Sequence, residues 1–353
     1  MLWYYLMLWL AMGGAAISMQ RNRLVRGYFG VLYFSSSVFV LAMLVGLRSS
    51  SPDYDSYSEW FSYVSANHLV AGDWIKDPAF VLVSAATSSL GLTFVSVSII
   101  FAFAALLSQF TFSILTIDKR LSTLLFFLVF CRTFAGSDMA AIRSAVAIPL
   151  MSISIILAFR GKKRLAIAIY CISIAFHLSA VIGIVPLLLA VCGVKFRSRG
   201  WILSVIAFAI IARFGLSQML GLLSQTSRVA VYLDVMMVQN GPPTAYLAYI
   251  AARILLMAFI LAFLWNKTSP EDRMVLFCFS VGISLQVLFI FNNALSWRSS
   301  DVFGLLDLCV LMIPFKWVTE GTRLAYTGVL VALGMLFFYS GLSILGPYRW
   351  VLA

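Results

Sequence analysis

The sequence predicts an all-α, polytopic membrane protein in which about 11–12 transmembrane helices form a bundle. Of its 353 residues, 62% are hydrophobic and only 11% are charged, and the mean hydropathy is +1.00. A soluble domain carries about 25% charged residues. Long apolar runs alternate with short basic clusters, as they do in membrane proteins whose cytoplasmic loops are basic. This composition excludes an ordinary soluble enzyme and a disordered chain. In a membrane protein, basic residues flank the spans on the cytoplasmic side. The net charge of +12 is therefore no reason to expect a nucleic-acid partner.

The predicted elements follow the apolar runs in chain order. The first run has no basic residue before it and is followed by Arg21, Arg23 and Arg26. We therefore expect a retained first helix with its N-terminus outside, rather than a cleaved signal. Residues 78–90 are apolar but too short to cross alone, so we expect an interfacial or half-inserted helix there. The predicted crossings are residues 2–19, 28–47, 92–116, 121–135, 140–159, 165–177, 178–193, 201–218, 246–264, 274–292, 303–317 and 324–345.

The apolar run at residues 165–193 needs a special explanation, because it is longer than one crossing requires. Basic clusters bracket it on both sides, at residues 160–164 and 195–199, and both should be cytoplasmic. The run must then enter the membrane and return, as a broken or hairpin segment with its turn near residues 176–179. Broken backbone at membrane depth is tolerated only inside protein or beside a wet cavity.

In this topology, the functional part of the protein faces the periplasm or the cell exterior. The two longest polar segments, near residues 48–77 and 219–245, become external loops of a single integral-membrane domain covering residues 1–353. Several basic residues also fall on the external side, where the positive-inside rule does not explain them. They are Arg48, Lys76, Arg132, Arg143, Arg213, Arg228, Arg253, Arg298 and Arg349. We expect an external catalytic cavity.

The arginines within or beside predicted crossings are the first candidates for binding. Charges inside a span cost about 2.5–3.5 kcal/mol on insertion scales, so they usually line a cavity or contact a partner. One interpretation is that Arg143, Arg213 and Arg253 form an anion-binding cavity. Arg132 lies at the end of another predicted span. Arginine is always charged and binds phosphate through a planar fork. The alternative is that these side chains extend to the interface or pair with carboxylates.

The first external loop combines acidic and aromatic residues. Arg48 is followed by Asp53, Asp55 and Tyr57. Carboxylates accept hydrogen bonds from sugar hydroxyls, and aromatic rings stack on sugar rings. The alternative is a solvated, helix-capping loop with aromatic residues at the membrane interface.

His177 is the histidine placed to act as a proton acceptor, because it lies at the predicted break in the apolar run. An imidazole can take a proton near neutral pH; the alternative is a hydrogen-bonded structural histidine. His68 lies in a loop and is expected to be solvated. Asn293 and Arg298 lie in a short polar insert between two crossings, where they could bind sugar or phosphate or cap helix ends.

No residue pattern points to a metal or cofactor. The five cysteines lie in apolar stretches without metal-binding or redox spacing, and there are only two histidines. Glycine-rich phosphate-binding loops are absent from the sequence, which argues against an ATP-driven pump. We expect a metal-independent protein with no cofactor.

Three motifs in chain order resemble those of the EpsG family of Wzy-type polysaccharide polymerases, found in capsule, exopolysaccharide and O-antigen clusters. The motifs are Arg48 with Asp53-Tyr54-Asp55, Tyr57 and Phe61; Arg143-Ser144-Ala145 leading to the basic residues 160–164; and residues 176–180 with Pro186 beyond. The likeness covers residues 28–200 best and extends over the rest mainly by hydropathy.

The resemblance implies a membrane glycosyltransferase at the periplasmic face of a bacterial inner membrane. Such an enzyme transfers a growing glycan from undecaprenyl pyrophosphate to an incoming lipid-linked repeat unit, without nucleotide sugar or metal. Its partners would be these lipid-linked donor and acceptor glycans and the bilayer, and we also consider a separate chain-length regulator. Arginines would stabilise the pyrophosphate leaving group. His177 or Asp55 would take the proton of the acceptor hydroxyl.

Two other functions remain open from the sequence. An O-antigen ligase uses the same donor with a different acceptor, but usually has a larger late external loop than residues 219–245. A lipid-linked oligosaccharide flippase or other transporter should show pseudo-repeated halves, and no repeat is evident here.

Overall fold

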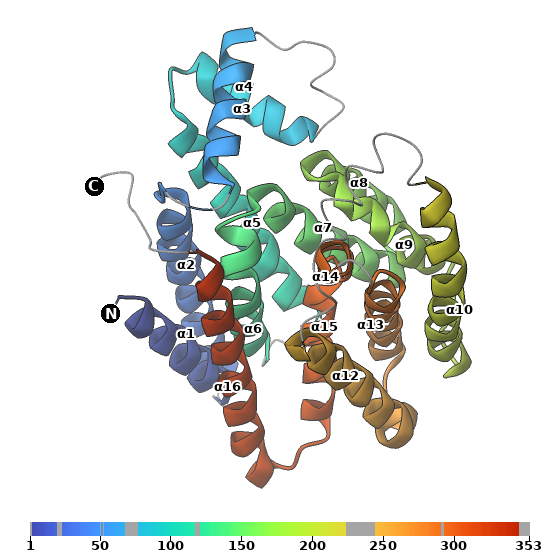
Figure 1. Ribbon diagram of the computed structural model, residues 1–353. Coiled ribbons are helices and arrows are strands. Elements are labelled where there is room, and N and C mark those ends of the chain that lie inside the picture. Colours follow the sequence, from blue (N-terminus) through green and yellow to red (C-terminus); the bar gives the residue numbers. More distant parts are fainter. Residues whose placement is uncertain are drawn as a thin grey trace. The chain divides into compact units, whose positions relative to one another are not determined.

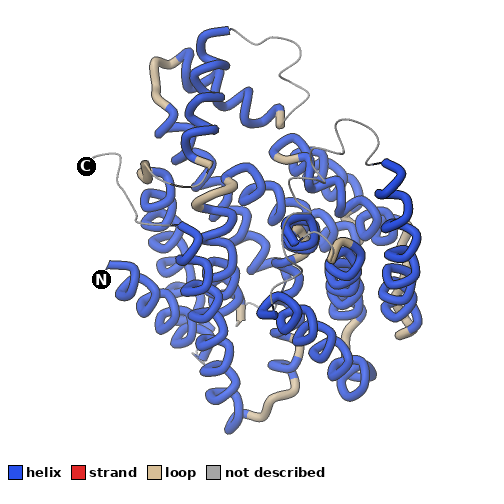
Figure 2. Tube along the Cα trace, in the orientation of Figure 1, coloured by secondary structure: helices blue, strands red, loops and turns tan. Residues whose placement is uncertain are grey.

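The computed structural model describes residues 2–19, 23–49, 51, 53–67, 77–116, 121–223, 244–290 and 293–345. Across these ranges the regular structure is helical throughout, and no strand occurs (Figure 2). Five helices in the described ranges are long and apolar enough to cross a membrane: Gly27–Gly46, Phe94–Thr116, Ile142–Phe159, Tyr246–Lys267 and Gly321–Leu342. The prediction of an all-α, multi-pass membrane protein is therefore confirmed.

The chain forms two compact units. Unit 1 combines Met1–Gly183 with Phe315–Ala353, and unit 2 is Ile184–Pro314. The prediction of one integral-membrane domain stays a prediction. The helices of unit 1 are α1 (Leu2–Met19), α2 (Arg23–Gly46), α3 (Tyr54–Asn67), α4 (Pro78–Ser89), α5 (Phe94–Thr116), α6 (Ser122–Thr133), the π-helical turn η2 (Phe134–Asp138), α7 (Ile142–Phe159), α8 (Lys163–Phe176), the 3-10 turn η3 (Leu178–Gly183) and α16 (Glu320–Leu345) (Figure 1).

Helix α6 is almost wholly buried within unit 1. Its phenylalanines Phe126, Phe127 and Phe130 are fully buried, as expected for a helix that is apolar on every side. It packs against α1, α5 and α16. Gly334 of α16 allows one of these contacts, because a Cβ there would lie 2.6 Å from Cε1 of Phe127. Small residues permit such close approach of membrane helices.

Helices α5, α7 and α8 pack together in unit 1. Helix α7 packs against both α5 and α8, and α4 contacts α5 and α8 (Figure 1). These four helices, together with α3, hold the side chains considered below.

Unit 2 is also helical. Its elements are α9 (Ile184–Val191), α10 (Gly200–Leu223), α12 (Thr244–Phe259), the π-helical turn η4 (Ile260–Leu264), the 3-10 turn η5 (Trp265–Lys267), α13 (Pro270–Leu288), α14 (Asn293–Asp301) and α15 (Gly304–Met312), and the 3-10 turn η6 (Pro314–Lys316) begins at its last residue. Helix α13 contacts α10, α12, α14 and α15. It begins with a capping box formed by Ser269 and Asp272, with Pro270 in its first turn.

The predicted crossings agree with the observed helices to within a few residues. The expected break near residues 176–179 is confirmed, because α8 ends at Phe176 and His177 is extended, with φ −160° and ψ 129°. The 3-10 turn η3 follows at once. The short apolar segment predicted at 78–90 is also a helix, α4.

The first polar segment is more ordered than a loop. Residues 54–67 form helix α3, on which Tyr57 and Val64 are buried. Tyr54 and Phe61 also pack inward, so the spacing of these four residues matches one face of a helix. Residues 68–76 and most of the second predicted loop, 224–243, lie outside the described residues, as does Arg349.

Candidate functional site

Three charged or titratable side chains from distant parts of the sequence meet in unit 1. Arg143 lies in the first turn of α7, His177 follows the last residue of α8, and Asp77 precedes α4. Oδ2 of Asp77 forms an ion pair with Nη1 of Arg143. Oδ1 of Asp77 lies 3.2 Å from Nδ1 of His177 and accepts a hydrogen bond from the backbone N–H of Leu178, also at 3.2 Å. Asp77 thereby links the arginine to the histidine.

The backbone at Asp77 has an uncommon conformation. Its φ of 52° and ψ of 62° lie in the left-handed region, and among the described residues no other non-glycine has positive φ. This conformation costs an L-residue about 1–2 kcal/mol, although Asp and Asn visit it more readily than most. Asp77 also occupies the N-cap position of α4, yet its side chain makes no capping hydrogen bond. The carboxylate is directed to Arg143 and His177 instead.

Two aromatic residues of α3 cover Arg143. Its Nε donates a hydrogen bond to the hydroxyl of Tyr57 at 3.3 Å. The guanidinium carbon lies 5.0 Å from the ring centroid of Tyr57 and 5.0 Å from that of Trp60. Both distances are within the range of cation–π attraction. The arginine is therefore held by hydrogen bond, ion pair and ring contact together.

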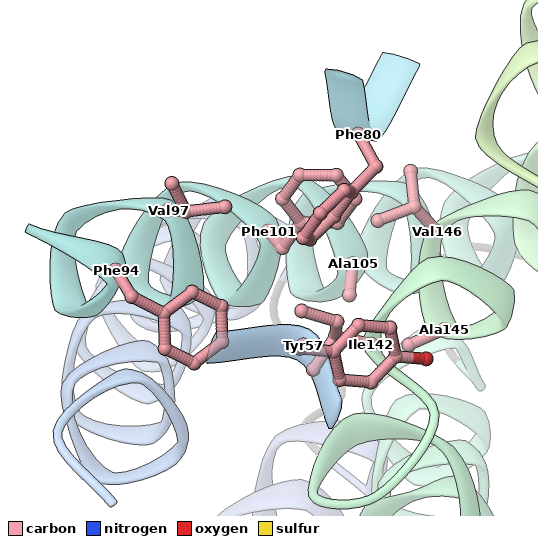
Figure 3. Close-up of a cluster of buried hydrophobic side chains, with 9 residues drawn as sticks. All are labelled: Tyr57, Phe80, Phe94, Val97, Phe101, Ala105, Ile142, Ala145 and Val146. Carbon is pink, nitrogen blue, oxygen red and sulfur yellow. The ribbon is translucent and has the colours of Figure 1, made fainter. Parts of the chain in front are cut away.

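A cluster of buried apolar side chains supports this arrangement. Phe80 of α4 stacks on Trp60 at 4.7 Å between ring centroids and also contacts Phe101 of α5. Figure 3 shows the Tyr57 ring beside Ile142 of α7, within the same cluster. Phe101 in turn contacts Phe176, the residue before His177, at 5.5 Å. Side-chain packing thus fixes the ends of α3, α4, α7 and α8 relative to one another.

The electrostatics keep Asp77 ionised. Burial alone would raise the pKa of Asp77, but the hydrogen bond with His177 and the charge of Arg143 outweigh burial, so the pKa lies below its usual 3.8. Burial raises the pKa of Tyr57, although the Arg143 charge opposes that rise. The exposed fractions of the side chains are 7% for Asp77, 20% for Arg143 and 31% for His177. The arginine and the histidine are therefore the members accessible to a ligand.

The other candidates of the first polar segment lie in different surroundings. Asp53 and Asp55 are exposed at the start of α3. Arg48 is only 1% exposed, and its Nη1 donates to the carbonyl oxygens of Val45 at 2.8 Å and Asp138 at 3.2 Å. The carboxylate of Asp138 accepts hydrogen bonds from Gln109 and Thr133.

Arg132 is the remaining candidate of unit 1. It lies at the end of α6, partly buried, with its guanidinium carbon 5.7 Å from the ring centroid of Phe337 in α16.

Arg253 belongs to a second polar cluster, within unit 2. Its side chain is 5% exposed, and Nη2 lies 2.8 Å from Oδ2 of Asp307. Nη1 donates to Oε1 of the fully buried Gln286 at 2.5 Å. The guanidinium carbon also lies 5.0 Å from the ring centroid of Phe279. Pairing with a carboxylate is the structural explanation that the sequence left open for an arginine in a span. Arg253 has such a partner in Asp307, which lies in the apolar helix α15.

The other candidates of unit 2 are placed on helix surfaces. Arg213 is exposed on α10, and Arg298 is exposed on α14. Asn293 begins α14, and its side chain lies outside the described part of the chain. The polar insert that contains Asn293 and Arg298 is thus helical.

Sequence reasoning missed the carboxylates of both clusters. In the sequence, Asp77 lies at the end of a long polar segment, and Asp307 lies within an apolar run. The available signal for Asp77 was the Asp77-Pro78 step before an apolar segment, because proline favours the first helical turn and aspartate the position before it. For Asp307, the signal was a lone carboxylate in a predicted crossing, which usually has a partner.

No group of three or more metal-ligating side chains occurs in the described ranges. The expectation of a metal-independent reaction stays a prediction, because this finding does not test it.

Comparison with known proteins identifies the family. A model of the EpsG family matches residues 31–350. Searches of the curated proteins and of the solved structures gave no match. The family match spans nearly the whole chain, including both polar clusters, and confirms the resemblance seen in the sequence motifs. This chain is therefore a multi-pass membrane protein that belongs to the EpsG family.

Proposed function

We propose that the protein is a membrane glycosyltransferase of the Wzy type. It would polymerise undecaprenyl-pyrophosphate-linked oligosaccharide repeat units at the periplasmic face of a bacterial inner membrane, without a metal ion. The observation that carries this proposal is the meeting of Arg143 and His177 at one buried carboxylate. The two residues were proposed separately from sequence for the two tasks such a transfer requires, stabilising pyrophosphate and accepting a proton.

In the proposed transfer, every bond, electron pair and proton can be accounted for. The oxygen of an acceptor sugar hydroxyl attacks the anomeric carbon of the donor glycan, and the bond from that carbon to pyrophosphate breaks. Undecaprenyl pyrophosphate leaves with the bonding electrons, and the hydroxyl proton passes to the base. A positioned general base typically contributes about 10²- to 10⁴-fold to such a step.

Arg143 is suited to the leaving group. Its Nη1 is used by Asp77 and its Nε by Tyr57. Nη2 takes part in neither contact and can donate to a phosphate oxygen. The guanidinium is fixed by these contacts before substrate binds. Such preorganised charge stabilises developing negative charge without reorganisation during the reaction.

His177 is favoured over Asp55 as the base. His177 is joined to Arg143 through a single carboxylate, whereas Asp55 lies exposed in the first turn of α3. The base and the pyrophosphate-binding cation should lie close together, because the broken bond and the attacking hydroxyl share one carbon. We assign Asp53 and Asp55 to sugar hydroxyls, and Tyr57 to holding Arg143.

Of the remaining candidates, we assign Arg132, Arg213, Asn293 and Arg298 to binding the lipid-linked donor and acceptor. Arg213 and Arg298 are favoured among them, because their side chains are exposed. Arg48 and Arg253 are buried and engaged by protein groups. The other proposed contacts are Arg132 and Asn293.

The glycan profile of a strain lacking the gene tests this function. A polymerase predicts that long chains disappear while a single repeat unit remains attached to its final acceptor, and that the wild-type gene restores the long chains. Loss of all attached repeats, with polymer still formed on the lipid carrier, would identify a ligase. Accumulation of single lipid-linked repeats on the cytoplasmic face would identify a flippase.

A further inference from the structure

We propose that Asp77 is a positioning residue that holds the imidazole of His177 with its proton on Nδ1, leaving Nε2 as the proton acceptor. This inference rests on the proposed function, because it gives His177 the role of base. It adds a residue that the motifs of the sequence did not include.

The location of the proton follows from the chemistry of the contact. An ionised carboxylate can only accept hydrogen bonds, and the pKa of Asp77 lies below its usual value. Nδ1 of His177 lies 3.2 Å from Oδ1 of Asp77, so the hydrogen between them belongs to Nδ1. A neutral imidazole carries one proton, which leaves a lone pair on Nε2. A hydrogen-bonded partner on one ring nitrogen commonly selects the tautomer in this way.

The backbone around the contact fixes the orientation of both partners. The same Oδ1 accepts the N–H of Leu178, the residue after the histidine. His177 is extended, between the end of α8 and the start of η3. Gly183, at the end of η3, packs against the sulfur of Met151 in α7, which leaves no room for a Cβ. The turn that carries the histidine is therefore held at both ends.

The cost of placing Asp77 also points to a specific role. Its left-handed backbone is unfavourable for an L-residue, and the side-chain cap that an aspartate could give α4 is not made. Such outliers tend to cluster at functional sites. In return, the two carboxylate oxygens contact Arg143 on one side and His177 on the other. The separation of the phosphate-binding cation from the base is thereby set by one side chain.

The ¹⁵N spectrum of the histidine side chains in the full-length protein tests the tautomer directly. The chain has only two histidines, so a His68→Gln background leaves a single imidazole signal, from His177. At a pH where the imidazole is neutral, we expect Nδ1 to be protonated and Nε2 to be unprotonated. Asp77→Gly should lose this pattern, because no carboxylate then accepts the hydrogen of Nδ1. A proton on Nε2 with Asp77 intact would overturn the inference.

Kinetics of the purified protein with lipid-linked repeat units provide the second readout. Asp77→Gly should lower kcat by about 10²- to 10⁴-fold. KM for the donor should change less than kcat, because Arg143 keeps its hydrogen bond to Tyr57 and its two ring contacts. Glycine suits the left-handed backbone, so a merely structural role predicts a folded protein with normal kcat.

The outcomes separate this inference from the proposed function. If His177→Ala abolishes transfer but Asp77→Gly keeps normal kcat, only the positioning role of Asp77 is wrong. If His177→Ala itself keeps normal transfer, the assignment of the base is wrong, and the inference is overturned with it.

Discussion

Replacing Arg143 with lysine tests whether this residue acts through the shape of its guanidinium or only through its charge. In the structure, Nη1 pairs with Asp77 and Nε donates to Tyr57 at 3.3 Å. The flat group also lies 5.0 Å from the centroids of two aromatic rings. An ammonium group keeps the charge, but it cannot occupy these positions and present a further planar donor to a phosphate oxygen.

The size of the effect follows from the contacts that lysine cannot replace. One lost hydrogen bond to a charged group is worth about 1.5–3 kcal/mol. If that bond is made to pyrophosphate in the transition state, the rate of transfer falls by about 10- to 150-fold. The fold should be retained, because a lysine ammonium can still neutralise the buried Asp77 carboxylate.

The assay is polymer formed per amount of membrane-inserted protein, with Arg164→Lys as the matched control. Arg164 is exposed in the first turn of α8, and its replacement should leave polymer formation unchanged. Wild-type activity of Arg143→Lys at a normal protein level would refute the reasoning, because it would reduce Arg143 to a point charge.

Three further predictions concern topology, packing and metal dependence. In a background without the five native cysteines, an impermeant thiol reagent should label Asp55→Cys from outside the cell and should not label Lys163→Cys; the reverse pattern would overturn the orientation. Gly282→Ala should destabilise the protein by about 1–3 kcal/mol, since a Cβ there would lie 2.9 Å from Nη2 of Arg253. Thermal melting in detergent checks this, with exposed Gly328→Ala as control, and equal melting temperatures would show that the arginine can move aside. Removal of divalent cations by a chelator should leave polymer formation by the purified protein unchanged, and loss that magnesium restores would contradict a metal-independent reaction.

The helices could be predicted from the sequence because the membrane imposes length and polarity on them. Observed α5 and α7 differ from the predicted runs by about two residues at most. The break at His177 follows from length and charge together: the apolar run is longer than one crossing, and basic clusters lie at both of its ends. These are properties of single segments, so they require no knowledge of which segments meet.

The partners of the arginines could not be predicted in the same way. Asp77 and Arg143 are 66 residues apart, and no periodic pattern relates a loop residue to the first turn of a later helix. Only packing of α3 and α4 against α5 and α7 brings them together. Asp307 similarly meets Arg253 through the contacts of α12 and α15 with α13.

The helix α3 shows a different reason for an incomplete prediction. Serine, tyrosine and acidic residues give it little overall hydropathy, so its sequence predicts a loop. Its buried face is formed by tyrosine and valine against the aromatic residues of α4 and α5. Tertiary packing thus decides the local structure, as it often does when intrinsic preference is weak.

The most direct test of the central claim is the length of the glycan made by a deletion strain that carries His177→Ala. The variant should be inserted at a normal level, as measured by immunoblot of the membrane fraction. If the cluster of Arg143, Asp77 and His177 is the transfer centre, the strain makes glycan that stops at a single repeat unit. A wild-type distribution of chain lengths from this variant would contradict the claim.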